Sequence, residues 1–260
     1  MKIMVCLKQV PNQDARLDID AAGTWIKEDG IKFEVNSYDL YALEEALRVK
    51  DAGEADVVAV SVGPDRVTQA LRTALGMGAD RAIHVKDPET AGSDGLGIAK
   101  ILAAVAKQES PDLILMGMMS DDGNFSAVPP MLAELIDVPH TTAAVKMVKS
   151  NGSLSIDREV EGGTREVVEL QAPCLVAVQT GMNQIRYASL KGIMAAKKKP
   201  FEVKTAADLG LEGQVGAASA KVKFESLSTP PKGEGAEILQ GSNDEIAGVL
   251  AGKIKELGLL

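Results

Sequence analysis

The amino-terminal half of the chain alternates short runs of β-branched and apolar residues with longer segments of helical periodicity. This alternation is typical of βαβ units, in which each helix connects two parallel strands of one sheet. It predicts an α/β fold with a Rossmann-like, mostly parallel sheet. The expected strands are residues 2–7, 56–62, 81–85 and 113–117, and the expected helices are residues 38–50, 66–75, 97–107 and 127–135.

The pattern changes after Pro139, where strand-like segments follow one another without helices between them. Asn151-Gly152 separates two of these segments, and this dipeptide is typical of tight β-hairpin turns. We therefore expect antiparallel strands added to the first sheet. The expected strands are residues 143–148, 153–160, 164–170 and 174–179.

The last sixty or so residues are expected to form a C-terminal extended arm plus a helix. Residues 200–241 have too little apolar periodicity to build a core, so this segment needs another surface to lie on. Ser242 and Glu245 fit a capping box at the start of a final helix. The sequence thus predicts an α/β domain over residues 1–200 and an arm over residues 201–260.

Composition argues against several classes of function. With 28 basic and 37 acidic side chains, a formal net charge of −9 and few aromatic residues, the chain is poorly suited to bind nucleic acid. No apolar run approaches the roughly 20 residues of a transmembrane segment. Cys6 and Cys174 lie in separate apolar runs, as reduced cysteines of a cytoplasmic protein do. His84 and His140 have no zinc-ligand spacing, and no nucleophile motif occurs, so independent catalytic machinery is not expected.

A polar loop follows the expected strand that ends at Gly117. Residues 120–126 read Ser-Asp-Asp-Gly-Asn-Phe-Ser and precede an expected helix. Unpaired backbone N–H groups and the helix dipole favour a phosphate at such a place, and Asn124 and Ser126 add side-chain donors. The alternative is that the loop only caps the helix. The glycine fingerprints of dinucleotide-binding proteins and of P-loops are absent from the sequence.

Other polar turns are expected beside this loop. In an open parallel sheet the carboxyl ends of the strands face one crevice, so Cys6, Val62 and the segment that opens the first long helix at Asn36 should converge there. This arrangement favours a nucleotide pocket. Taken singly, Asn36 or Ser37 could be a helix N-cap, and Gly63-Pro64 could be an ordinary turn.

A basic segment stands out in the otherwise acidic chain. Between residues 186 and 204 the only acid is Glu202, and the apolar residues Leu190, Ile193 and Met194 lie among the basic ones. Such a surface suits a partner with an apolar pocket and an acidic rim, whereas a solvated charged face is the alternative. The basic residues are Arg186, Lys191, Lys197, Lys198, Lys199 and Lys204.

Four motifs together resemble the beta subunits of electron transfer flavoproteins. The most specific is residues 183–199, which read NQIRYASLKGIMAAKKK. Residues 158–163 (REVEGG), 74–81 (ALGMGADR) and 8–11 (KQVP) are similar to further motifs of that family. The resemblance runs from Met1 to about Gly210, and the tail agrees with it in character.

This resemblance implies a heterodimer in which an alpha subunit carries most contacts to a redox-active FAD. The family accepts electrons from acyl-CoA dehydrogenases or related flavoenzymes and passes them to a membrane quinone oxidoreductase, the ETF-quinone oxidoreductase. The common type of beta subunit also binds a structural AMP, and its carboxyl-terminal arm wraps the alpha subunit. An electron carrier rather than an independent enzyme is therefore expected.

Family positions can be transferred to this chain where its motifs match. Tyr38 matches a flavin-contact position, and a recognition loop falls on about residues 180–200. The AMP-contact positions fall on Cys6, Asn36, Ser37, Tyr38, Asp39, Val62, Leu115, Gly117, Asp121, Asp122, Gly123, Asn124, Phe125 and Ser126, and the partner-docking positions on Arg186, Leu190, Ile193, Met194, Lys197, Lys198 and Lys199.

Two departures from the family pattern leave alternatives open. The chain has Asn124-Phe125-Ser126 where the AMP type usually has Asn-Gln-Thr, and Ile185 replaces a usual proline. An electron-bifurcating, NADH-dependent branch of the family places a second FAD in the AMP site, and residues 122–130 are intermediate between the two types. The lysine triplet at 197–199 favours AMP. A nucleotide-binding regulatory protein that dimerises is the alternative from another class.

Overall fold

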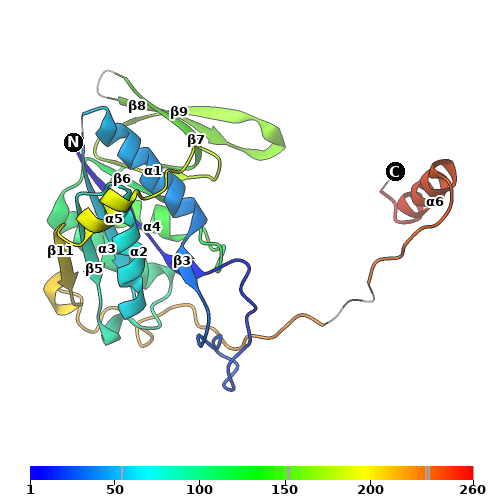
Figure 1. The fold of residues 1–260 in the computed structure, drawn as a ribbon, viewed down its shortest axis with the longest axis horizontal. Helices are drawn as coiled ribbons and strands as arrows, with labels where there is room; N and C mark the ends of the chain where they lie inside the picture. Colours follow the sequence, from blue (N-terminus) through cyan, green and yellow to red (C-terminus); the bar gives the residue numbers. More distant parts are fainter. Residues whose placement is uncertain (54, 151–152, 232, 234, 260) are drawn as a thin grey trace.

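The computed structural model describes residues 1–53, 55–150, 153–231, 233 and 235–259. Within these residues, nine strands form one sheet in the order β11-β5-β4-β1-β6-β10-β7-β8-β9 (Figure 1). The strands expected in the amino-terminal half are confirmed to within one residue at each end. The strands are β1 (Lys2–Cys6), β4 (Asp56–Val62), β5 (Arg81–Val85), β6 (Leu113–Gly117), β7 (His140–Ser150), β8 (Ser153–Glu159), β9 (Arg165–Gln171), β10 (Cys174–Val178) and β11 (Phe201–Lys204).

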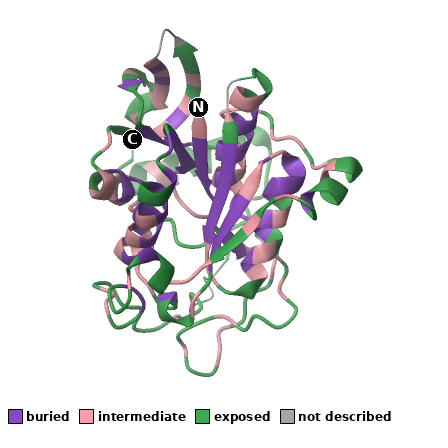
Figure 2. Ribbon diagram, turned by 90° about the vertical axis from the view of Figure 1, so that its left-hand side faces the viewer, coloured by how far each residue is buried: buried purple, intermediate pink, exposed green. Residues whose placement is uncertain are grey.

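Helices cover both faces of the sheet. Ile3 and Val5 of β1 face a core built with α1, α2 and α5, whereas Met4 and Cys6 face a core built with α3 and α4. Because both faces are covered, the central strands are buried along nearly their whole length (Figure 2). The helices are α1 (Ser37–Asp51), α2 (Thr68–Met77), α3 (Gly95–Glu109), α4 (Val128–Ile136), α5 (Leu190–Ala196) and α6 (Asn243–Glu256).

The added strands extend the same sheet, as expected. β7, β8 and β9 pair antiparallel, and the turn predicted at Asn151-Gly152 lies outside the described residues. The expectation of antiparallel pairing is wrong for β10, which lies between β6 and β7 and runs parallel to both. Hydrophobic periodicity identifies a strand but carries no information about the direction of its neighbours.

The sheet continues into the segment that the sequence assigned to the arm. Residues 201–204 form β11, which pairs parallel with β5 at one edge of the sheet. Leu209 and Val215 are then buried against the core that contains α3. The sequence did not predict this strand, because four residues are too few to show a hydrophobic periodicity.

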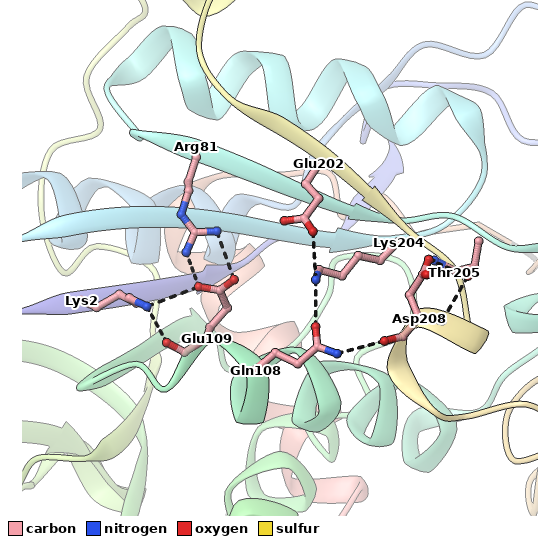
Figure 3. A network of polar contacts seen from close by, with 8 residues as sticks. All are labelled: Lys2, Arg81, Gln108, Glu109, Glu202, Lys204, Thr205 and Asp208. Carbon is pink, nitrogen blue, oxygen red and sulfur yellow. Dashed lines mark hydrogen bonds and ion pairs between the residues drawn. The ribbon is translucent and has the colours of Figure 1, made fainter.

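Polar contacts around the end of α3 fix β11 and two other strands (Figure 3). Lys204 Nζ lies 3.0 Å from Glu202 Oε1 and donates to Gln108 Oε1 at 2.8 Å, while Gln108 Nε2 donates to the Asp208 carbonyl at 2.9 Å. Glu109 pairs with Arg81 and Lys2 at the starts of β5 and β1. The hydrogen bonds from Arg81 lower the pKa of the Glu109 carboxyl.

Beyond the sheet, the carboxyl-terminal segment leaves the domain. The backbone N–H groups of Lys221 and Val222 donate to Asp94 Oδ2 at 2.6 and 3.0 Å, and Leu227 N donates to the Gly23 carbonyl at 2.7 Å. Beyond this last contact the chain runs outward to α6, which stands clear of the domain (Figure 1). The capping box is confirmed, because Ser242 N donates to Glu245 Oε2 at 2.8 Å and Glu245 N donates to Ser242 Oγ at 3.4 Å. Among the described helices, none combines the length and the apolar character that a bilayer span requires.

Candidate functional site

The carboxyl ends of β1, β4 and β6 lie side by side at one edge of the sheet. Cys6 is in register with Val60 on one side and with Met116 on the other, so Val62 and Gly117 end at the same edge. β3 (Phe33–Val35), which pairs antiparallel with β2 (Gln9–Pro11), leads into α1 at this edge. The structure therefore brings together the turns that the sheet topology selected.

Asp39 joins these elements. It is buried in the first turn of α1, its Oδ2 accepts a hydrogen bond from Lys8 N at 2.7 Å, and its Oδ1 accepts one from Gly117 N at 2.8 Å. A Cβ atom on Gly117 would lie 2.5 Å from both Asp39 Oδ1 and Tyr38 Cβ. Only glycine allows β6 to approach α1 this closely.

Burial shifts the pKa values of the Asp39 carboxyl and of the two cysteine thiols. It raises the pKa of Asp39 to about 7, although the hydrogen bonds from Lys8 and Gly117 lower it. Burial also raises the pKa of the Cys6 thiol far above its usual range, and the Asp39 charge adds to this effect. The pKa of the Cys174 thiol rises to about 11 for the same reason, so both free thiols stay protonated.

The loop that follows β6 is tied to the start of α1. Asn36 Nδ2 donates to the Met119 carbonyl, and Asp121 N donates to Asn36 Oδ1, both at 2.9 Å. Asp121 then accepts from Ser37 N at 2.9 Å and from Ser37 Oγ at 2.8 Å. Asn36 makes no capping bond to its own helix. The carboxylate that stabilises the start of α1 therefore comes from the distant loop.

Capping does not explain residues 120–126 either. α4 begins at Val128 with no side-chain cap bond, and Pro129 and Pro130 remove two of the N–H groups that a helix start normally offers. The start of α4 therefore has few free N–H groups, and the polar groups at this place are those of the loop itself. Its residues 122–126 are exposed, and Asn124 and Ser126 have φ values of 49° and 48°.

A cation that the sequence analysis did not select lies on this loop. Lys8 Nζ is 2.6 Å from Asp122 Oδ1 and 3.1 Å from Ser120 Oγ, and the lysine side chain is half exposed. The Lys8 backbone is held by Asp39 on one side and by Asn36 N on the other. The sequence offered one signal for a role of Lys8, because this residue lies two positions beyond the end of a buried strand. Lys8 therefore lies on the loop that also carries Asn124 and Ser126, and all three side chains can donate hydrogen bonds to an anion.

The basic segment carries an exposed apolar surface on and beside α5. Leu190 and Met194 are 83% and 73% exposed, and Tyr187, which was not among the selected residues, is 96% exposed. Ile193 is half exposed. We call Tyr187, Leu190, Ile193 and Met194 the apolar patch. Lys191, Lys197 and Lys198 are exposed in the same segment.

Two of the cations expected to face a partner are bonded to the domain. Arg186 pairs with Glu44 and Asp51, and the hydrogen bonds that its guanidinium donates to Glu44 raise its pKa further. Lys199 Nζ donates to the carbonyls of Leu75 and Ala79 at 3.0 and 2.6 Å, near the end of α2. Burial and the nearby Lys50 charge lower the pKa of Lys199.

Comparison with known proteins decides the family of this chain. The model of the electron transfer flavoprotein domain matches residues 23–209. The chain belongs to the electron transfer flavoprotein family. It is 36% identical to the electron transfer flavoprotein subunit beta of Methylophilus methylotrophus, with 98% of each chain covered. The subunits beta of Bradyrhizobium diazoefficiens, at 39% identity over 82% of this chain and 84% of the relative, and of Homo sapiens, at 33% over 99% and 98%, are also similar.

Membership confirms the resemblance seen in the sequence motifs. It makes the chain a beta subunit of an electron-transfer flavoprotein, which implies association with a flavin and with an alpha subunit. Family membership decides against the alternative of a nucleotide-binding regulatory protein that dimerises. The described residues contain no group of three or more His, Cys, Asp or Glu side chains that could hold a metal ion.

Proposed function

We propose that the chain is the beta subunit of a heterodimer that takes electrons from acyl-CoA dehydrogenases or related flavoenzymes and delivers them to a quinone oxidoreductase. FAD, bound mostly by the alpha subunit, supplies the redox chemistry. This chain binds the nucleotide that braces the domain, supports the alpha subunit and presents a docking surface. The observation that carries the proposal is the apolar patch beside exposed lysines in a member of this family.

The proposed contact with the alpha subunit rests on the carboxyl-terminal arm. α6 has no buried residue, and it stands clear of the domain with Val249, Leu250 and Leu257 about half exposed or more (Figure 1). Ile238 on the arm is 82% exposed. Apolar side chains presented in this way favour burial against another subunit. We propose that the arm wraps the alpha subunit.

The proposed nucleotide is AMP. A phosphate would be held by Lys8 and by polar groups of the loop at residues 120–126, beside the start of α1. The lysine matters because Asp121 and Asp122 place negative charge at the same edge, and an anion there needs a cation close by. A second FAD in this position, as in the electron-bifurcating branch, is the competing assignment.

Replacing Asn124 by glycine is expected to lower the AMP content of the purified heterodimer several-fold. The change removes the amide donor, while glycine accepts the φ of 49° without strain. Bound nucleotides are released by denaturation and quantified by chromatography. The wild-type heterodimer should release one AMP and one FAD, and the variant should keep its FAD.

Ser110→Gly is the matched control. Ser110 has the same φ of 49°, but it follows the end of α3, at the amino ends of the parallel strands and away from the candidate site. Its AMP content should equal that of the wild type. Normal AMP content in the Asn124 variant would remove the loop from the binding site. Two FAD molecules and no AMP in the wild type would establish the bifurcating type instead.

Replacing Leu190 by alanine is expected to slow reduction of the heterodimer by an acyl-CoA dehydrogenase about tenfold or more. An exposed leucine that fills a partner pocket is typical of an interface hot spot. Stopped-flow absorbance of the flavin measures the rate at sub-saturating dehydrogenase. Val203→Ala, at a 54% exposed position on β11, is the control. Equal rates for wild type and Leu190→Ala would count against docking through the apolar patch.

A further inference from the structure

Two consecutive glutamates, Glu44 and Glu45, are buried in the middle of α1. Their residues are only 4% and 6% exposed. Burying a carboxylate costs free energy unless it is paired and hydrogen-bonded, so the partners of the two glutamates indicate their structural role. Apart from Arg48 on the same helix, these partners come from residues 183–186, which lie outside regular secondary structure and lead into α5.

Arg186 engages Glu44 through its side chain and its backbone. Its Nε lies 2.8 Å from Glu44 Oε2, one terminal nitrogen lies 2.9 Å from Glu44 Oε1, and its backbone N donates to Oε2 at 3.2 Å. The other terminal nitrogen lies 2.8 Å from Asp51 Oδ2, two turns further along α1. A planar guanidinium held by three carboxylate oxygens has a single orientation.

Asn183 provides a second attachment three residues earlier. Its Nδ2 donates to the Tyr41 carbonyl and to Glu45 Oε2, both at 3.0 Å. Between the two attachments, Ile185 packs against the core beneath α1. Residues 183–186 are thus attached to one face of α1 through Asn183 and Arg186.

α5 is fixed at the other side of the apolar patch. Ser189 Oγ accepts from Gly192 N at 3.0 Å, and a Cβ atom on Gly192 would lie 2.3 Å from the Gly76 carbonyl oxygen of α2. Arg72 of α2 donates to the Ala196 carbonyl at 2.7 Å. Tyr187 and Leu190 therefore project from a short segment that is anchored on both sides.

We propose that Glu44, Glu45 and Asp51 form a carboxylate socket that holds the docking segment in its binding conformation, with Arg186 as a positioning residue that does not touch the partner. The proposal rests on the docking role of the apolar patch. A pre-ordered segment avoids the entropy loss of ordering on association, so the socket strengthens binding without adding a contact. Its loss should weaken association and leave electron transfer within the complex unchanged.

The decisive variant is Glu44→Gln, because Glu44 is buried and cannot reach a partner. The flavin-loaded heterodimer is assayed with a purified acyl-CoA dehydrogenase as electron donor. We expect the KM for the heterodimer to rise about tenfold in both Glu44→Gln and Arg186→Gln, with kcat within twofold of wild type. Arg186→Lys, which keeps the charge but loses the bidentate geometry, should give an intermediate KM.

Hydrogen exchange of the heterodimer reports the order of the segment directly. Backbone amides of residues 183–192 should exchange at least several-fold faster in Glu44→Gln and Arg186→Gln than in wild type. Lys198→Gln is the matched control, since it removes one positive charge from the same segment without touching the socket. It should leave exchange unchanged, and any effect on KM should disappear at high salt.

Different results of these experiments would overturn either the carboxylate socket or the docking role of the apolar patch. A raised KM in Arg186→Gln with wild-type KM and exchange in Glu44→Gln would overturn the socket and make Arg186 a direct partner contact. Unchanged KM in both variants would also overturn it. A normal rate in Leu190→Ala would remove the docking role itself, whereas a slow Leu190→Ala with a normal Glu44→Gln removes only the socket.

Discussion

Replacing Gly117 by alanine is expected to lower the free energy of unfolding by about 3 kcal/mol. The new Cβ atom would lie 2.5 Å from Asp39 Oδ1 and from Tyr38 Cβ, so β6 and α1 would have to separate. Their separation would stretch the hydrogen bond from Gly117 N to Asp39 and leave a buried carboxyl partly unsatisfied. Thermal unfolding of the heterodimer measures the loss as a lower Tm, and the AMP content should fall with it.

Gly95→Ala is the control for this substitution. Its Cβ atom would meet only Val128 Cγ2 at 3.7 Å, which is an ordinary contact, and Gly95 is the first residue of α3. Its stability should stay within about 0.5 kcal/mol of wild type. A Gly117→Ala protein as stable as Gly95→Ala would show that β6 and α1 are not held as closely as the structure indicates.

Stability is also expected to depend on pH through Asp39. Burial raises the pKa of this carboxyl from 3.8 to about 7, so between these values the folded chain keeps a proton that the unfolded chain releases. The stabilising contribution is complete below about pH 4 and is lost as the pH rises through 7. For one such group the loss amounts to roughly 2–3 kcal/mol between pH 5 and pH 8.

The measurement compares unfolding of wild type and Asp39→Asn across that pH range. The difference in stability between the two proteins should shift against the wild type as the pH rises. Asp94→Asn is the control, because the hydrogen bond from Gly97 N lowers the pKa of Asp94 and its titration falls below pH 5. Its curve should run parallel to that of the wild type. A parallel curve for Asp39→Asn would contradict the raised pKa.

The amino-terminal half of the fold could be predicted because local pattern and final burial agree there. β4, β5 and β6 are short apolar runs bounded by charged residues or glycine, and each is buried within one sheet. The parallel direction of β10 could not be predicted, since it depends on β6, nearly sixty residues earlier. β11 has partly exposed side chains and no apolar run of its own.

The candidate site was predictable to the extent that topology determines it. The ends of β1 and β6 meet because parallel strands share an edge, which requires no knowledge of side-chain contacts. The roles of Lys8, Glu44 and Arg186 depend on long-range pairing that composition does not encode. Glu44 did give one signal, because it lies four residues after Leu40 and three before Leu47, on an apolar stripe of α1.

The position of β10 has a consequence for the order in which the chain can fold. Among the described strands, β10 alone joins the antiparallel extension of β7, β8 and β9 to the rest of the sheet. The extension can pair locally as it leaves the ribosome, but it has nothing to join until residue 178 has been synthesised. Completion of the β5 edge waits until residue 204. The sheet is therefore completed late, by β10 at its centre and β11 at one edge, and an assembly that needs the complete sheet must follow synthesis of residue 204.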